Sequence, residues 1–328
     1  MKRLIITVGL LTLTPLLAGA QDTWTIVDDN GTTITVPANP TRIVAIDNQI
    51  ITAPLYELGY SVVGTVGRED ANINDGKPFM RSLTAMLGLQ FDDESGITYI
   101  GNWREPDLEL IASLNPDLII TITDANDVYD KLAVIAPTAA VEFEQPMLDI
   151  YAKVAEIVGE TEQFEERRAL YQARVATTRG LLEDQLGPLS DITVAVVEPT
   201  FDEGIWITRD LHAFSQVAAD LGFGMPDFYK NMPESWAQIS AEAIQESEAD
   251  FMVGSYTTIF PEDQPADKRA AFEANLPGWN EFLHAPRNNQ HFFLNREEIR
   301  PVMFSVLETT MAVVVSQMGT REFVPFEE

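Results

Sequence analysis

The sequence predicts an α/β protein of two lobes with mostly parallel central sheets, joined by one long helix. Short apolar runs alternate with helical segments in both halves of the chain, which is the pattern that builds parallel sheets. Between the halves, residues 161–186 read as a single helix. A matched acidic motif occurs once in each half, at 107–111 and at 240–244. The chain of 328 residues is long enough for two ordinary domains.

Residues 1–20 have the features of a secretory signal peptide. Lys2 and Arg3 form a basic start, residues 4–17 are mostly apolar, and residues 18–20 are the small residues of a cleavage site. The chain contains no Cys, which excludes disulfides, thiolate metal sites and a lipid-modified N-terminal Cys. We expect a soluble periplasmic protein that starts at Gln21 and does not insert into the membrane after signal cleavage.

The charge balance restricts the partners of the mature chain. Without Lys2 and Arg3, 19 basic residues stand against 51 acidic ones, which gives a net charge of −32. Such a chain repels nucleic acid and anionic membranes, so neither is an expected partner. The acidity most simply serves solubility, and it makes any cluster of Arg residues noticeable.

The N-terminal half, residues 21–145, is predicted to form the first lobe. It opens with a hairpin whose two strands, 24–28 and 33–36, flank an Asn30-Gly31 turn. Continuous apolar runs then predict strands buried on both faces at 43–46, 62–66, 118–122 and 138–141. Helices are predicted near 54–58, 80–87, 105–113 and 128–135, and the rest of 71–96 is irregular.

A connecting region, residues 146–187, leads to the second lobe. A helix over 146–158 ends at Gly159, and the spine helix (161–186) follows with Thr161 as its expected N-cap. Apolar and aromatic residues share one face of this helix: Phe164, Tyr171, Val175, Thr178, Leu182 and Leu186. Gly187 and Pro188 end it. At 1.5 Å per residue the spine helix is a rod of roughly 39 Å.

The C-terminal half, residues 188–328, repeats the alternation and is predicted to form the second lobe. Strands are predicted at 193–197, 251–254 and 290–294, with an irregular hairpin over 201–207. Helices are predicted at 213–221, 240–246, 268–275 and 301–318.

The acidic motif recurs with the same spacing in both halves. Asp107 and Ser240 are good N-caps, which places Glu109 and Glu242 in the first turn of a helix, and an Asp opens a buried strand eight residues after each Glu. One such Glu would be explained by the helix dipole. Two of them, at matched positions of two lobes, would present a symmetric pair of acids to an external partner.

Four segments together carry a family resemblance: 31–45, 101–120, 236–250 and the spine helix. They resemble the periplasmic substrate-binding proteins of iron–siderophore, haem and vitamin B12 ABC importers, and the resemblance covers nearly the whole mature chain. It implies the class III periplasmic binding protein fold, with a cleft between the lobes and little hinge motion. It also implies a monomeric receptor without enzymatic activity, whose Glu109 and Glu242 dock on an ABC transporter permease dimer.

Arginines and aromatic residues follow the predicted strands of both halves. The predicted ligand-binding residues are Arg104, Arg209, Arg296, Arg68, Arg300, Trp103, Trp206 and Tyr256. Guanidinium offers a planar fork to carboxylate or catecholate oxygens. Within the family, this set suits an anionic ferric siderophore, an Fe³⁺ complex gripped from both lobes by Arg104 and Arg209. No cofactor is expected, and direct iron ligation is assigned to no residue, although Tyr256 or His212 could approach a metal.

Two other functions stay open. A haem- or cobalamin-binding receptor of the same family is one of them; haem would need an axial Tyr or His such as Tyr256 or His212, and neutral cobalamin would not require several Arg. A secreted hydrolase is the alternative from a different class. The sequence contains no Gly-x-Ser-x-Gly, no His-Glu-x-x-His, no Gly-rich phosphate loop and no Cys nucleophile that would favour it.

Overall fold

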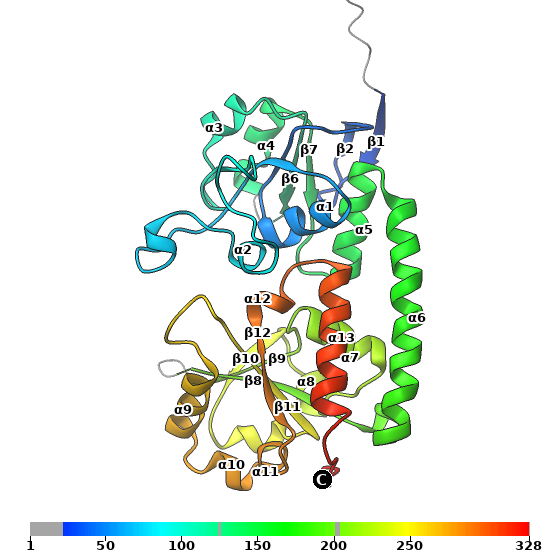
Figure 1. Ribbon diagram of the computed structural model, residues 1–328, viewed down its shortest axis with the longest axis vertical. Coiled ribbons are helices and arrows are strands. Elements are labelled where there is room, and N and C mark those ends of the chain that lie inside the picture. The colour runs from blue at the N-terminus through cyan, green and yellow to red at the C-terminus, as the bar shows by residue number, and fades with distance from the viewer. Residues whose placement is uncertain (1–21, 124–125, 201–203, 328) are drawn as a thin grey trace, which may run out of the picture.

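The protein folds as two α/β lobes connected along one side by a long helix (Figure 1). The computed structural model describes residues 22–123, 126–200 and 204–327, and the predicted signal peptide lies outside them. The spine helix is α6 (Thr161–Leu186), 26 residues that run beside both lobes. This arrangement confirms the predicted fold class. None of the helices within the described ranges combines the length and the apolar character that a bilayer span requires.

The N-terminal lobe contains an all-parallel sheet of five strands in the order β5-β4-β3-β6-β7. Its strands are β3 (Ile43–Ala45), β4 (Val62–Thr65), β5 (Thr98–Tyr99), β6 (Leu118–Ile122) and β7 (Thr138–Val141). The hairpin β1 (Thr23–Val27) and β2 (Thr33–Pro37) stands beside it. The helices are α1 (Ala53–Glu57), α2 (Arg81–Leu87), α3 (Leu108–Ser113), α4 (Asn126–Ile135) and α5 (Met147–Val158). The central strands β3 and β6 are fully buried, as continuous apolar runs predict.

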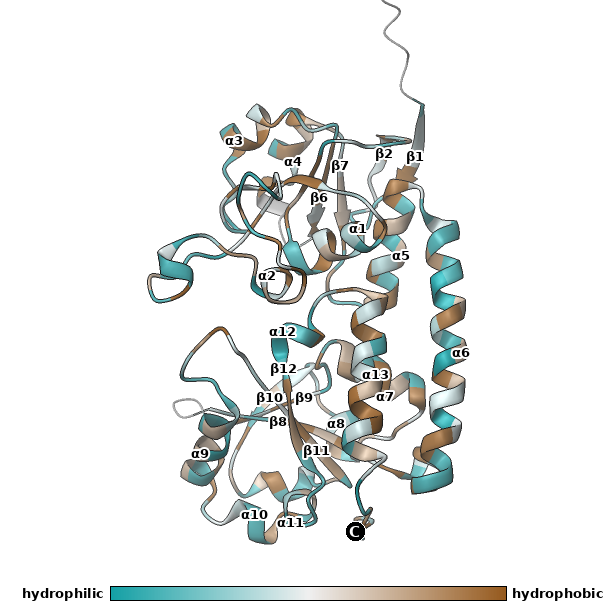
Figure 2. Cartoon of the chain, viewed as in Figure 1, coloured by the Kyte–Doolittle hydropathy of each residue, from teal (hydrophilic) through white to brown (hydrophobic). Residues whose placement is uncertain are grey.

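The C-terminal lobe contains a mixed sheet of five strands in the order β10-β9-β8-β11-β12. Strands β8 (Val194–Thr200), β11 (Phe251–Tyr256) and β12 (His291–Asn295) are parallel, whereas β9 (Gly204–Thr208) and β10 (Trp236–Ile239) are added as antiparallel strands. The helices are α7 (Ala213–Leu221), α8 (Asp227–Lys230), α9 (Pro265–Asn275), α10 (Trp279–Phe282), α11 (His284–Arg287), α12 (Arg296–Ile299) and α13 (Phe304–Met318). In both lobes the central strands are the hydrophobic part of the ribbon (Figure 2).

Several local elements differ from the sequence-based expectation, among them the short helices α8, α10, α11 and α12, which were not predicted. Residues 240–246 do not form an α-helix; a short 3₁₀ helix covers Ala243–Ser247, and Glu242 precedes it. Only Ile244 and Ser247 of this turn are buried, so it has too small an apolar face to support an α-helix. The edge strand β10 was not predicted, because its residues alternate between exposed and half-buried. A π-helix, η1 (Asn48–Thr52), directly follows β3.

The spine helix packs as its periodicity predicts. Its buried residues are Phe164, Tyr171, Val175 and Leu182, with Thr178 and Leu186 half-buried. The helix begins at Thr161 as expected, although the capping position belongs to Glu160. Near its N-terminal end an aromatic cluster joins three helices: the ring of Phe304 in α13 lies 5.0 Å from Tyr151 of α5 and 5.8 Å from Phe164. Further along α6, the Tyr171 hydroxyl donates to Asp220 in α7.

A second connection between the lobes is a capped helix end. The carboxylate of Glu57, at the end of α1, accepts hydrogen bonds from the backbone N–H groups of Phe304 (2.8 Å) and Ser305 (2.9 Å) at the start of α13. A carboxylate at a helix N-terminus satisfies N–H groups that have no partner within the helix and interacts favourably with the helix dipole. Beside it, the N–H of Val302 donates to the carbonyl of Gln49 at 2.9 Å. The lobes are therefore joined by backbone and charge-assisted hydrogen bonds as well as by α6.

We predict that Glu57→Ala lowers the free energy of unfolding by about 1–3 kcal/mol, because two N–H groups at the start of α13 lose an ionised acceptor. Urea denaturation followed by circular dichroism measures this change. Glu308→Ala is the control, since Glu308 forms a partly exposed ion pair with Arg174 at 2.8 Å, and such a pair contributes at most about 1 kcal/mol. Equal losses in the two variants would contradict a special role for the cap.

We also predict that the lobes move little when a ligand binds, because a continuous helix and the capped end of α13 hold them on the same side. Small-angle X-ray scattering curves of the free and ligand-saturated protein should nearly superimpose. A large decrease in the radius of gyration on binding would show that neither connection resists closure.

Candidate ligand-binding site

The candidate site lies where α2 of the N-terminal lobe meets α12 of the C-terminal lobe, a region called here the lobe junction (Figure 1). The loops that follow parallel strands contribute to it from both lobes: Asp47 follows β3, Arg68 follows β4, Thr257 follows β11 and Arg296 follows β12. Ligands of α/β proteins bind outside the carboxyl ends of the strands. Figure 2 shows α12 as a hydrophilic element although it lies between the lobes. The junction is thus a polar site placed where the fold favours binding.

A buried ion pair crosses the junction. The guanidinium of Arg81 in α2 lies 2.5 Å from the carboxylate of Glu297 in α12, and the two side chains are 9% and 0% exposed. Glu297 also accepts hydrogen bonds from the hydroxyls of Ser82 (3.1 Å) and Thr257 (2.9 Å). Gln49, in the π-helix, extends the network by donating to the Ser82 hydroxyl at 2.6 Å. The carboxylate is therefore held by donors from both lobes.

Two further arginines approach this pair without a partner of their own. Within the described part of the chain, the guanidinium groups of Arg68 and Arg300 make no hydrogen bond and no ion pair. Burial, followed by the charge of Arg81, lowers the pKa of Arg300 to about 10, so that it stays protonated at neutral pH. The same two causes lower the pKa of Arg68. Together with Arg81 and Arg296 they form what we call the arginine cluster.

The fourth member, Arg296, is held by residues of its own lobe. It donates to the Ser255 hydroxyl at 2.9 Å and lies 3.5 Å from the carboxylate of Glu198. Burial raises the pKa of Glu198, against the opposing effect of Arg296. Asp47 shows the same behaviour, since burial raises its pKa although Arg300 and Arg68 lower it. Three carboxyls thus face four guanidiniums, and two of those three resist ionisation.

His212 borders the cluster as a neutral imidazole. Burial, then the charges of Arg300, Arg296 and Arg81, lowers its pKa to about 3. Its backbone adopts a left-handed φ of 50°, which is unusual for a residue other than Gly. The ring therefore adds no charge to the cluster at neutral pH.

Several buried polar atoms in this region have no hydrogen-bond partner. They include Asn48 Oδ1, Arg81 Nε, Glu198 Oε1 and Trp206 Nε1. Trp206 on β9 stands directly opposite Glu198 on β8 in the antiparallel ladder. Buried polar groups are normally satisfied, and unsatisfied ones concentrate where a ligand or water binds. These atoms are donors and acceptors that a bound ligand or water molecule can use.

The structure brings together only some of the predicted ligand-binding residues. Arg68, Arg296 and Arg300 meet in the arginine cluster. Arg104 is exposed and lies over the ring of Trp103 at 4.6 Å, and the guanidinium of Arg209 donates to the carbonyl of Glu234 at 3.0 Å.

The remaining predicted aromatics are partly buried. Trp206 packs on Trp236 with ring centroids 5.0 Å apart. Tyr256 is the last residue of β11, and burial raises the pKa of its hydroxyl. Sequence reasoning missed Arg81 and Glu297, which follow no recognisable motif. Arg81 begins a helix inside an irregular stretch, and Glu297 is one of 51 acidic residues.

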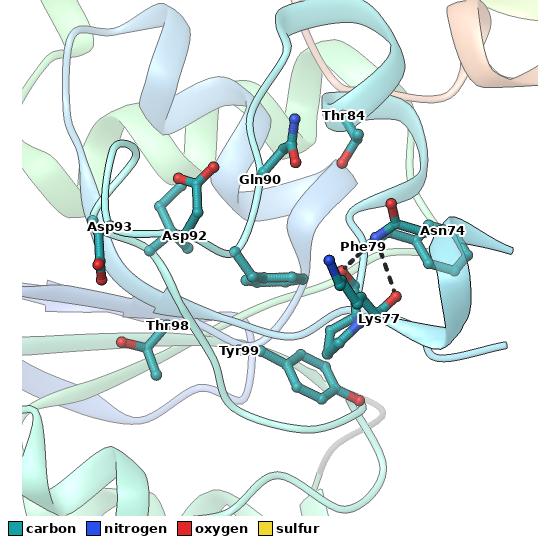
Figure 3. Close-up of a pocket in the computed structure, with 13 residues that line it drawn as sticks. Asn74, Lys77, Phe79, Thr84, Gln90, Asp92, Asp93, Thr98 and Tyr99 are labelled. Carbon is teal, nitrogen blue, oxygen red and sulfur yellow. Dashed lines mark hydrogen bonds between the residues drawn. The ribbon is translucent and has the colours of Figure 1, made fainter. Parts of the chain in front are cut away.

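A separate cavity of about 560 Å³ lies in the N-terminal lobe beside the loop that carries Arg68 (Figure 3). Phe79, which lines it, pairs with Arg68 through two backbone hydrogen bonds. Phe91 and Tyr99 form an aromatic wall with ring centroids 5.1 Å apart, and Asp92 and Asp93 stand on another side. None of the arginine cluster lines this cavity. Within the described residues, no group of three or more His, Asp or Glu side chains is placed to hold a metal ion.

The protein is similar to several characterised binding proteins. YfiY of Bacillus subtilis (strain 168), a probable siderophore-binding lipoprotein, is 31% identical over 242 residues, which cover 71% of this chain and 69% of that protein. Two solved structures share the fold. SirA of Staphylococcus aureus complexed with staphyloferrin B has a TM-score of 0.73 at 21% identity, over 90% of this chain and 99% of that chain. FhuD of S. pseudintermedius has a TM-score of 0.68 at 22% identity, over 91% and 99%.

The family match covers the middle and most of the C-terminal part of the chain, and of the arginine cluster it includes Arg296. The sequence pattern of the periplasmic binding protein family matches residues 84–297, which include most of the C-terminal lobe and the spine helix. This span is well over half of the 328 residues. The two-lobed fold with its helical connection agrees with that match. The chain belongs to the periplasmic binding protein family.

Proposed function

We propose that the protein is a periplasmic receptor that binds an anionic ferric siderophore at the lobe junction and delivers it to an inner-membrane ABC permease. The observation that carries the proposal is the arginine cluster, in which the forks of Arg68 and Arg300 have no partner within the described residues. The likeness to a probable siderophore-binding lipoprotein supports the iron–siderophore class. The family is one of binding proteins rather than enzymes, and nothing in the site favours the hydrolase alternative.

The chemistry of the cluster favours an anion rich in oxygen. Burial, and after it repulsion by the charge of Arg81, lowers the pKa of Arg68 and Arg300. An anionic ligand relieves the repulsion and fills the open forks with charge-assisted hydrogen bonds. A neutral ligand such as cobalamin would leave the charges unbalanced. The chelate itself holds the iron in this proposal, so that Tyr256 and His212 contact the chelate rather than the metal.

The direct test adds candidate ferric chelates to the purified protein and follows complexes by native mass spectrometry and visible absorption. Ferric citrate represents the anionic class, and ferrichrome represents the neutral hydroxamates. We expect a one-to-one complex with the anionic chelate and poor binding of the neutral one. Preferential binding of ferrichrome would overturn the anionic assignment, and binding of haem alone would overturn the siderophore assignment.

We predict that Arg300→Ala weakens the binding of an anionic ferric chelate by roughly ten- to a hundredfold, because one charge-assisted fork is lost. Arg300→Lys should fall between this variant and the wild type, since it keeps the charge and loses the planar fork. Isothermal titration calorimetry measures both.

The control for this series is Arg174→Ala, which removes an equal charge from the outer side of α6, where Arg174 pairs with Glu308. We expect smaller effects for Arg104 and Arg209, whose guanidiniums already contact Trp103 and the Glu234 carbonyl. If Arg300→Ala and Arg174→Ala bind alike, the cluster is not the ligand site.

We also propose that Glu109 and Glu242 are the permease-docking residues. Asp107 caps α3 by accepting from Leu110 N–H, which leaves Glu109 exposed in the first turn. Glu242 is exposed, and hydrogen bonds from its own backbone N–H and from Ser240 lower its pKa, so it is ionised under all physiological conditions. Exposed acids at matched positions in two lobes suit a partner with two equivalent basic sites.

We predict that the double variant Glu109→Ala/Glu242→Ala keeps the chelate affinity of the wild type and abolishes uptake. Uptake of ⁵⁵Fe-loaded chelate into cells that carry the cognate permease, together with calorimetry of the purified protein, measures both properties. Glu105→Ala/Glu246→Ala removes two exposed acids near the same elements and should support normal uptake. Normal uptake by the Glu109/Glu242 variant would exclude these residues from docking.

A further inference from the structure

The carboxylate of Glu297 occupies the position that an anionic ligand would need. It binds the guanidinium of Arg81 at 2.5 Å and is completely shielded from solvent. Its charge favours the protonated forms of Arg68 and Arg300, which means that it acts on the whole cluster and not only on Arg81. An incoming anion at the junction would have the same electrostatic effect. The arginine cluster therefore already holds one anionic group, the carboxylate of Glu297.

The hydrogen bonds of Glu297 divide between the lobes. Arg81 and Ser82 belong to α2 of the N-terminal lobe, whereas Thr257 belongs to the C-terminal lobe that carries Glu297 itself. Asn295, which caps α12 by accepting from the Glu297 N–H at 3.2 Å, also belongs to the C-terminal lobe. If α2 shifts slightly, Glu297 keeps its partner Thr257 and releases Arg81. The arrangement thus allows an exchange of anions on Arg81 in which Glu297 keeps the hydrogen bond from the Thr257 hydroxyl.

A buried ion pair is an ineffective way to stabilise a protein, because desolvation of both charges offsets most of their attraction. The same pair is effective as an exchangeable contact, because a second anion can replace the carboxylate of Glu297 while the guanidinium of Arg81 stays neutralised. Glu198 pairs with Arg296 and Lys268 of its own lobe, whereas the ion pair of Glu297 crosses from one lobe to the other.

We propose that Glu297 is an internal competitor of the ligand: it closes the lobe junction on Arg81 in the free protein, and the anionic ligand displaces it. Glu297 thereby sets the affinity and the charge selectivity of the site. This inference rests on the proposed function, because it assumes that an anion binds at the arginine cluster. A purely structural role of Glu297 would have the opposite effect. In that role Glu297 would orient Arg81 for the ligand, and the loss of Glu297 would weaken ligand binding.

The test is Glu297→Gln, which keeps the size of the side chain and one acceptor oxygen and removes the charge. We expect the affinity for ferric citrate, measured by isothermal titration calorimetry, to rise on the order of tenfold. Glu298→Gln is the matched control. Glu298 is the next residue, is exposed, and accepts a hydrogen bond from Asn295 at 2.9 Å. Its replacement removes the same charge and should change the affinity by less than about twofold.

Two outcomes would overturn the inference. Weaker or unchanged binding by Glu297→Gln would show that Glu297 supports the site instead of competing for it. An equal gain in Glu297→Gln and Glu298→Gln would show that only the overall charge matters. Should Glu297→Gln fail to fold, Ser82→Ala provides a second test, because it removes one donor that holds Glu297 at the junction. That variant should then bind ferric citrate about two- to threefold more tightly, and a loss of affinity would reject competition.

A further measurement separates this inference from the proposed function. If the wild type does not bind ferric citrate, that chelate is excluded as the ligand, and the role of Glu297 is tested with metal-free citrate. The rise in melting temperature that citrate causes should be larger for Glu297→Gln than for the wild type or Glu298→Gln. Identical rises in all three proteins would overturn the internal competitor.

Discussion

Like charges are costly to hold together away from water, and the lobe junction depends on how that cost is met. Arg81 is only 9% exposed and shares its surroundings with Arg68 and Arg300. The buried carboxylate of Glu297 offsets part of their repulsion, and in the proposed function an anionic ligand balances the remaining positive charge. The π-helix after β3 belongs to the same system, since Gln49 connects it to Ser82 and so to Glu297. π-Helical turns inside proteins are frequently found at functional sites, and this one lies beside the candidate site.

The scaffold holds Arg81 of the N-terminal lobe beside Glu297 of the C-terminal lobe. Arg81 and Glu297 are 216 residues apart, so their contact requires that both lobes be held in register. The spine helix gives one support, and the aromatic cluster of Tyr151, Phe164 and Phe304 anchors α13 against it. The Glu57 carboxylate then places the first turn of α13 on the N-terminal lobe, only a few residues after α12. Because α12 and α13 are adjacent in the chain, fixing the start of α13 also fixes Glu297 opposite Arg81.

The features that depend on local sequence could be predicted, and those that depend on distant contacts could not. The spine helix has the bounds that its periodicity predicts, although Thr161 is its first residue and not its N-cap, and the buried strands follow continuous apolar runs. Arg68, Arg296 and Arg300 were found because they follow strands or begin helices. The partnership of Arg81 with Glu297 has no local signal, since neither residue belongs to a motif and the pair forms only through the tertiary fold. Strand β10 and the 3₁₀ turn after it were misread for a related reason: their apolar residues are too few to give a clear period.

The acidity of the chain raises the question of how such a protein could bind an anion. The formal net charge is −30, which would repel a negative ligand at long range in dilute salt. At physiological ionic strength the Debye length is about 8 Å, so most surface carboxylates of a two-lobed protein do not reach the junction. What a ligand meets there is determined by the groups within that distance. They include the four guanidiniums, the Lys268 ammonium beside Glu198, a neutral His212, and the carboxyls of Asp47, Glu198, Asp263 and Glu297. Burial raises the pKa of Asp47 and Glu198, and Glu297 is the carboxylate that contacts a guanidinium of the other lobe. The acidity of the surface is therefore compatible with the proposed preference of the site for anions, because salt screens the surface charges much more than the buried ones.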